Sequence, residues 1–305
     1  MREKWLVVCA LWAGGACGLA QQAETALSAG EIMSRVAANQ DKAEAERSHY
    51  VYVQHARVAS RKGKAVRCEE TTDSRITPSA KGYEAQLLKL DGRMLVKGKY
   101  VTYTTLPEPK DKSKADEKGD EKKDDESLSV EINDGTMDRD MVENMRSGLI
   151  HDKSKDGLDA RLFPLTTKNQ TDYWFRLVGR ERMNGHDVFH IEFHPKDKND
   201  FGWKGDAYID TASFQPVLVS TAMARKIPFA VRTLLGTNVP GLGFSVVYAP
   251  QPDGVWFPTS FGTEFKMRIL FFLTREISID AHNVDFEKTH VRSRIVEADG
   301  AAPER

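Results

Sequence analysis

The chain has 305 residues, and its 44 Lys and Arg residues nearly balance 45 Asp and Glu, giving a formal net charge of −1. This even balance argues against a basic nucleic-acid-binding surface or a polybasic membrane patch. Apolar residues make up 40% of the chain, an ordinary globular composition that does not suit a disordered, collagen-like or multi-span membrane protein.

Residues 1–20 have the pattern of a secretory signal peptide that is removed from the mature protein. A charged start and an apolar run at 5–13 precede small residues, Gly18 and Ala20, at the −3 and −1 positions of a cleavage site. The run is shorter than the roughly 20 residues that a membrane span needs. We therefore expect an exported protein; a lipoprotein anchored through Cys17 is the alternative.

The remaining sequence predicts one domain, residues 21–295, followed by a flexible tail at 296–305. Within it, residues 107–127 contain nine acidic and six Lys residues and almost nothing apolar. Such a segment cannot offset its ordering entropy by burial, so we predict a disordered loop inserted in the domain. A charged interaction tether is the alternative.

Three helices are predicted. Ser28 and Glu31 have the spacing of a capping box and begin a helix over 29–46, whose second half is nearly all charged or Ala. A second helix is predicted over 137–147, and a short one over 228–235. The second helix carries an apolar stripe formed by Met137, Met141, Val142, Met145 and Leu149.

From His49 onward the apolar period changes to two, which is typical of β-strands. Counting the first strand, which starts at Tyr50, eleven strands are predicted. The others are expected at 64–76, 81–90, 93–105, 172–182, 186–195, 204–210, 215–224, 243–249, 254–266 and 268–280. Because helical patterns are few, we predict a mainly β (α+β) fold dominated by antiparallel sheet.

The first hairpin is expected to turn at Asp91-Gly92, a strong two-residue turn signal. That turn would place Tyr83, Ala85 and Leu87 opposite Tyr100, Gly98 and Val96, respectively.

A second hairpin surrounds Met183-Asn184-Gly185, and its loop length decides which side chains face each other. A two-residue loop sets Leu177 against Glu192, whereas a three-residue loop sets it against Ile191. The apolar pattern favours the second register, so we predict a three-residue loop with a left-handed Gly185 at a bulge.

Residues 255–279 carry an apolar side chain at most odd positions and polar residues on the even face. About 25 residues exceed the length of an ordinary strand, so two long strands are expected, with a turn near 266–268 and a kink at Gly262. The apolar face is either core or the lining of a cavity, because both need an apolar concave surface.

No motif indicates catalysis or metal binding. His186, His190 and His194 are spaced by four, but on a strand neighbours in this set lie about 13 Å apart, too far for one metal ion. The chain lacks a nucleophile elbow, a zinc-protease motif and a phosphate-binding loop. We expect no catalytic residues, no metal and no cofactor, and hold a hydrolase as a third hypothesis only.

The order of the β segments resembles a known family. They include a strand ending at Pro195, a strand ending at Asp210, a strand led by Pro216, and the start Gly254-Val255-Trp256-Phe257-Pro258. Together with the export signal and first helix, this resembles the LolA-like outer-membrane lipoprotein-sorting proteins, well over 170–290 and loosely over 28–105. The charged insert and the segment near 225–243 depart from that pattern.

The resemblance implies an incomplete β-barrel, a curved antiparallel sheet whose helices form a lid over an apolar cavity that holds acyl chains. It also implies a periplasmic carrier of lipid or lipoprotein. The alternative is a non-catalytic envelope interaction or sensor protein whose cavity is filled by its own side chains. The residues expected to line the cavity are Phe257, Phe261 and Phe265 on the sheet, with Met141 and Met145 in the lid.

Overall fold

The computed structural model describes most of the region between the first helix and the last strand. The described ranges are 27–79, 82–106, 135–151, 165–197, 202–224, 242–269 and 273–289. The signal peptide with Cys17, the charged insert, the helix expected at 228–235 and the tail lie outside these ranges.

Eleven strands form one antiparallel sheet. Its order is β4-β3-β2-β1-β11-β10-β9-β8-β7-β6-β5, so β4 and β5 lie at opposite edges and the sheet does not close into a barrel. The strands are β1 (Tyr50–Lys62), β2 (Ala65–Ser79), β3 (Gly82–Val96), β4 (Lys99–Tyr103), β5 (Tyr173–Met183), β6 (His186–Pro195), β7 (Trp203–Asp210), β8 (Pro216–Met223), β9 (Gly243–Pro250), β10 (Trp256–Ile269) and β11 (Leu273–Lys288). The prediction of a mainly β, open antiparallel sheet is confirmed.

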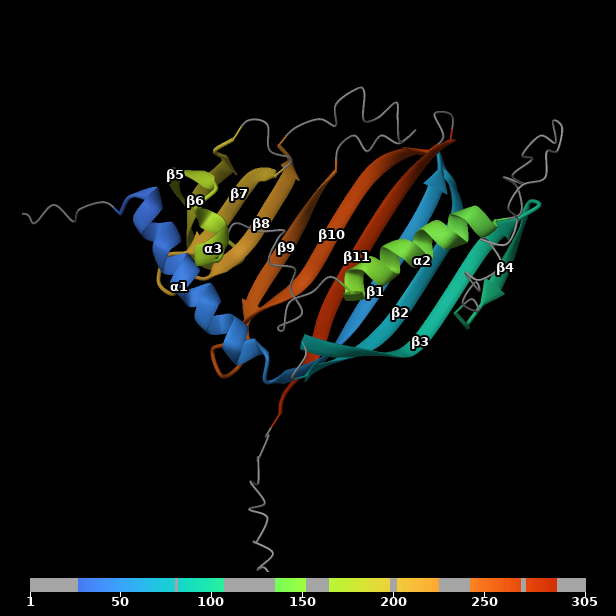
Figure 1. Cartoon of the computed structure of the whole chain (residues 1–305), viewed down its shortest axis with the longest axis horizontal. Helices are drawn as coiled ribbons and strands as arrows, with labels where there is room; N and C mark the ends of the chain where they lie inside the picture. Colours follow the sequence, from blue (N-terminus) through green and yellow to red (C-terminus); the bar gives the residue numbers. More distant parts are fainter. Residues whose placement is uncertain are drawn as a thin grey trace, which may run out of the picture.

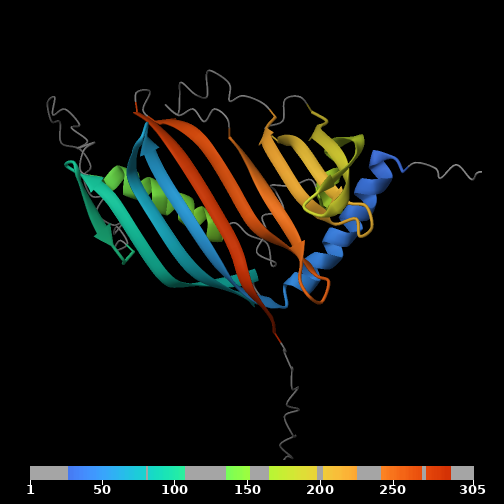
Figure 2. The same cartoon turned by 180° about the vertical axis from the view of Figure 1, so that it is seen from behind.

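The sheet is curved, and its two long helices lie on the concave side (Figures 1 and 2). Directly paired residues define a row that crosses this concave face. The row runs Leu177, Ile191, Ala207, Val219, Val246, Phe261, Ala281, Ala56, Thr72 and Leu90. Because opposite residues in a sheet point to the same side, this nearly continuous apolar row is one face of the fold.

The helices are α1 (Ala29–Arg47), α2 (Thr136–His151) and the short α3 (Thr167–Gln170), which the sequence did not predict. The capping box at the start of α1 is confirmed. The Ser28 side chain accepts a hydrogen bond from the Glu31 backbone N–H at 3.2 Å, and Glu31 accepts one from the Ser28 N–H at 2.8 Å. Such a cap contributes about 1 kcal/mol to helix stability.

The predicted turn of the first hairpin is wrong. Residues Asp91 and Gly92 lie inside β3, and the chain reverses at Lys97 and Gly98, which both have positive φ. A Cβ on Gly92 would lie 2.3 Å from the ring of Tyr103, the residue opposite. Gly92 is therefore required for close approach of an aromatic ring rather than for a turn.

The second hairpin combines both registers that the sequence allowed. Its turn has two residues, Asn184 and left-handed Gly185, so the predicted three-residue loop is wrong. A bulge between Leu177 and Gly179 then shifts the register, and Leu177 faces Ile191 as predicted. The bulge lies within β5 and not at the turn. Its extra residue shifts the pairing by one position, so that apolar residues of β5 and β6 face each other beyond it.

Strands β10 and β11 divide the long apolar segment as expected, but the chain reverses between Ile269 and Leu273, later than predicted. The odd residues of both strands share one face, as the pairing of Phe265 with Ile277 shows. The irregularity of β10 lies between Pro258 and Ser260 and not at Gly262.

Candidate functional site

The concave face carries two separate apolar clusters, each beneath one long helix. Beneath α1 the cluster joins Ile32, Met33 and Val36 to strands β6–β10. Beneath α2 the second cluster contains Val58, Cys68, Met141, Val142, Phe265, Ile277 and Ile279. The site is therefore an apolar face with a helix over each part.

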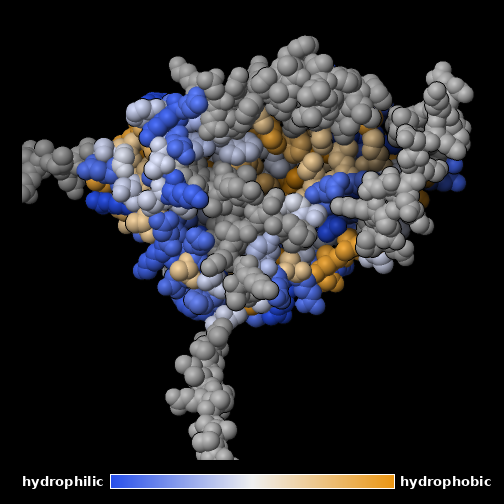
Figure 3. All heavy atoms as spheres, viewed as in Figure 1, coloured by the Kyte–Doolittle hydropathy of each residue, from blue (hydrophilic) through white to orange (hydrophobic). Residues whose placement is uncertain are grey.

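Phe261 of β10 lies between these two clusters. It is only partly buried, and it packs against both of them. Its ring stacks at 5.7 Å on that of Phe244, which belongs to the cluster beneath α1. Leu242 and Met267 are likewise partly buried apolar residues at the border of the second cluster. Phe261 thus lies between the two helix-covered clusters, with further partly exposed apolar side chains next to the second one, and Figure 3 shows apolar surface on this face.

Three of the five residues expected to line a cavity come together beneath α2. Phe265 and Met141 are buried members of that cluster, and Met145 packs against it. Phe261 adjoins them on the same face.

The fifth residue, Phe257, lies apart from the others. It pairs with Ala249, whereas Phe261 pairs with Val246, and the register of β10 against β9 shifts between Pro258 and Ser260. Phe257 packs instead against Tyr50 and Phe286, at 4.8 and 4.6 Å between ring centroids. The register shift could not be predicted, because a bulge leaves no periodic signal in the sequence.

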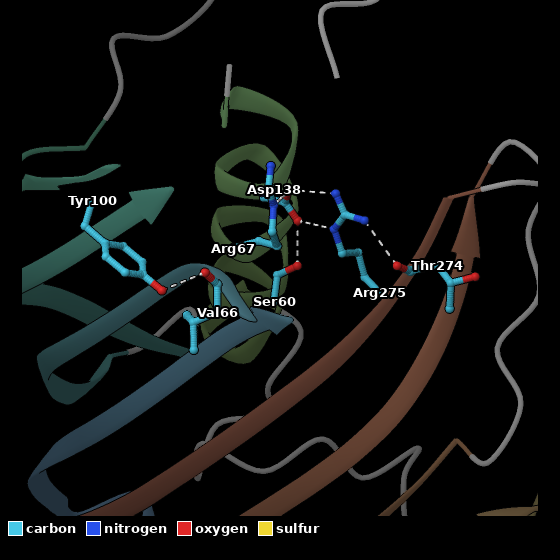
Figure 4. A network of polar contacts seen from close by, with 7 residues as sticks. All are labelled: Ser60, Val66, Arg67, Tyr100, Asp138, Thr274 and Arg275. Carbon is cyan, nitrogen blue, oxygen red and sulfur yellow. Dashed lines mark hydrogen bonds and ion pairs between the residues drawn. The ribbon is translucent and has the colours of Figure 1, made fainter. Parts of the chain in front are cut away.

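A buried ion pair fixes the start of α2 to the sheet (Figure 4). Arg275 of β11 donates two hydrogen bonds to Asp138 of α2, at 2.6 Å from Nε and 3.0 Å from Nη2. The Ser60 hydroxyl donates a third to the same carboxylate at 2.7 Å, and Arg67 lies 3.5 Å away. Burial opposes ionisation of Asp138, but these hydrogen bonds and charges outweigh it and lower its pKa.

Another polar contact lies further along α2. Arg146 donates to the fully buried carboxylate of Glu70 at 2.9 Å, and the Tyr103 hydroxyl donates to the same group at 2.8 Å. Burial nevertheless dominates and raises the pKa of Glu70. Cys68 lies 3.3 Å from the Tyr103 hydroxyl, and burial raises the pKa of its thiol to about 11. The helix is therefore held by buried charges as well as by apolar packing.

This polar network was not predicted, although the sequence contains two signals of it. Arg275 is the one charged residue among the odd positions of 255–279, so it had to face the core. Asp138 precedes Met141 by three residues, so it shares the apolar stripe of its helix.

The three His residues of β6 have different surroundings. His186 lies 3.0 Å from Asp210, and His190 lies 2.7 Å from Asp206 and 3.2 Å from Glu181. In the described ranges, no group of three or more His, Cys, Asp or Glu side chains is placed to hold a metal ion. Nor is any helix of the described chain long and apolar enough to cross a membrane.

Two hollows lie away from the apolar row. One, of about 380 Å³, lies between α1 and the turn that joins β9 to β10. The other, of about 440 Å³, lies over β6–β8 and is lined by Glu192, Phe193, His194, Lys204 and Asp206 among others. Both have polar and charged walls.

A scan of the sequence against protein-family models finds no match, and a search among curated proteins finds none either. A comparison with solved structures finds matches of low similarity. An outer membrane lipoprotein-sorting protein domain from Vibrio parahaemolyticus has a TM-score of 0.36 and 12% identity, with 86% of this chain and 95% of that chain covered. A DUF1329 family protein from Desulfovibrio piger has a TM-score of 0.36 and 10% identity, with 86% and 94% covered.

A LolA superfamily protein from Nitrosomonas europaea has a TM-score of 0.33 and 11% identity, with 87% of this chain and 96% of that chain covered.

Proposed function

We propose that this protein is a non-catalytic periplasmic binder of acyl chains from a lipid or lipoprotein. The single observation that carries the proposal is the position of Phe261, partly buried on an apolar row and between two helix-covered clusters. An acyl chain that lies along this face would gain about 0.8 kcal/mol of binding free energy for each methylene group that it buries. Shape-tolerant burial needs no specific hydrogen bond.

The proposed contact residues are Phe261 and Phe265 on β10, with Met141 and Met145 on α2. Unbranched Met side chains repack easily around variable apolar shapes, which suits chains of different length and saturation. Phe257 is left out of this set because it packs against Tyr50 and Phe286 and belongs to neither cluster. An acyl chain would reach the border between the clusters first, where apolar side chains are partly exposed.

A second candidate function is an envelope interaction or sensor protein whose apolar face is filled by its own side chains. The buried ion pair of Asp138 with Arg275 favours it, because that pair holds α2 close to the sheet. The two candidates differ in whether the purified protein contains lipid.

The test is mass spectrometry of lipids carried through a mild purification, for the wild type and for Phe261→Asp. Acyl-chain binding predicts lipid in the wild type and its loss in the variant. Leu88→Asp is a matched control, because Leu88 is 53% exposed on β3 and outside both clusters. A folded Phe261→Asp protein that still carries lipid would exclude this face as the binding site.

A further inference from the structure

The hollow of about 380 Å³ next to α1 has the size of a small-ligand site. The second half of α1, the β9–β10 turn, the residue before β8 and the end of β11 all contribute to its wall. The lining residues are Asn39, Lys42, Ala43, Glu46, Gln215, Asp253, Gly254, Val255, Trp256 and Lys288.

Four of these residues are charged, and their charges cancel. Lys42 and Glu46 lie one turn apart on α1, whereas Asp253 and Lys288 come from the other elements and form an ion pair at 3.1 Å. A net-neutral wall offers no net attraction to an anion or a cation. It can, however, match a ligand that carries both charges at separate ends.

Hydrogen bonds hold the walls in place. Gln40 donates to the Gln215 side chain at 2.8 Å, and buried Arg47 donates to the backbone carbonyl of Trp256 at 3.2 Å. Asn39 donates to the Ser213 carbonyl at 2.8 Å. These contacts explain why α1 buries polar residues in its second half, where the sequence showed no apolar face. A pre-formed site loses little free energy to ordering when a ligand binds.

Trp256 connects the hollow to the apolar face. It lines the hollow, and it is also a buried member of the cluster beneath α1. A ligand with a polar head and apolar chains could therefore place its head here and its chains over the concave face.

We propose that this hollow receives a zwitterionic headgroup that carries a phosphate and an ammonium group, phosphoethanolamine being the simplest. The inference rests on the proposed acyl-chain binding. Lys42 contacts the phosphate, and Glu46 contacts the ammonium group.

The test compares three fluorescent lipids with the same acyl chains: phosphatidylethanolamine, phosphatidylglycerol and diacylglycerol. Free O-phosphoethanolamine, followed by NMR shifts, separates a lipid headgroup from a free zwitterion. The variants are Lys42→Gln and Glu46→Gln, with Lys64→Gln, exposed in the β1–β2 turn, as the control.

The wild type is expected to bind phosphatidylethanolamine about fivefold more tightly than phosphatidylglycerol, the gain of one partly exposed charged contact. Its affinity for diacylglycerol should be lower still, because that lipid makes neither contact. Glu46→Gln should remove the preference over phosphatidylglycerol, and Lys42→Gln should weaken the binding of both phosphate-containing lipids. Both variants should leave diacylglycerol binding unchanged, whereas Lys64→Gln should change nothing. Equal binding of the three lipids overturns the headgroup site and leaves the acyl-chain site intact.

If none of the three lipids binds, the acyl-chain proposal fails. The binding of free O-phosphoethanolamine then decides whether the hollow is a zwitterion site. Binding of O-phosphoethanolamine that both variants weaken then supports the hollow as a zwitterion site. Absence of that binding overturns it.

Discussion

Asp138 of α2 and Arg275 of β11 form a bidentate ion pair, and each side chain is only 2% exposed. They are 137 residues apart in sequence, so the pair forms only when α2 lies on the sheet. Removing one partner from a buried pair leaves the other charged group desolvated without compensation. The pair therefore specifies where the helix lies more than it adds net stability.

Asp138→Ala is expected to lower the free energy of unfolding by about 3–5 kcal/mol, measured by urea denaturation. The double variant Asp138→Ala/Arg275→Met should lose less than this, because no buried charge remains unpaired. Arg176→Ala, which breaks the exposed pair with Glu192, should cost at most about 1 kcal/mol. A cost for Asp138→Ala no greater than that of Arg176→Ala would contradict the role of the buried pair.

Stability should depend on pH in opposite directions through Asp138 and Glu70. The pKa of Asp138 lies below its ordinary value of 3.8, so its contribution is present above that value and is lost as the pH falls through the folded pKa. Burial raises the pKa of Glu70 above 4.5, so its contribution is present below that value and is lost as the pH rises through the folded pKa.

Glu70→Gln isolates the second of these effects. The unfolding free energy of the wild type minus that of Glu70→Gln should fall as the pH rises from about 4 to 7, because only the wild type must bury a carboxylate. Urea midpoints across this range measure the difference. A difference that grows with pH would show that the contacts with Arg146 and Tyr103 outweigh burial.

Gly92→Ala is expected to destabilise the protein by about 1–3 kcal/mol, because the added Cβ overlaps the Tyr103 ring. Gly148→Ala on α2 is the matched control. Its Cβ meets no atom within 4 Å, so it should stabilise the helix by about 0.4–1 kcal/mol. Thermal melts of the two variants should therefore shift in opposite directions; shifts of the same sign would argue against the close approach in β3.

Cys68 should react with alkylating reagents only when the protein unfolds. The residue is fully buried, and burial raises the pKa of the thiol to about 11, so little thiolate exists at pH 8. Labelling followed by mass spectrometry should show no modification in buffer and full modification in urea. Rapid labelling of the folded protein would mean that α2 leaves the sheet readily.

Much of the fold could be predicted because strands with one buried face leave a period of two in the sequence. Strand β6 was predicted with its bounds, and the shared face of β10 and β11 followed from their odd positions. Turns were less predictable. The residues Asp91-Gly92 are typical of a two-residue turn. The actual role of Gly92, which is to leave space for the Tyr103 ring, depends on the pairing of β3 with β4 and leaves no local signal.

The candidate site could be predicted only in part for the same reason. Periodicity grouped Phe265 with the Met residues of α2 but could not detect the bulge that separates Phe257 from Phe261. The burial of Asp138 could not be predicted from its neighbours in sequence, because it depends on a partner far along the chain. Arg275, the one charged residue among apolar odd positions, did indicate a buried charge.

The most direct test of acyl-chain binding by the apolar face is a titration with a fluorescent fatty acyl probe. The proteins compared are the wild type, Phe261→Asp and Leu88→Asp. Circular dichroism first establishes that the three proteins are equally folded. We expect saturable binding to wild type and Leu88→Asp. Phe261→Asp should lose about tenfold or more in affinity, because its carboxylate must be desolvated against the acyl chain. Equal affinity of all three folded proteins for the probe would contradict the assignment of the apolar face to acyl chains.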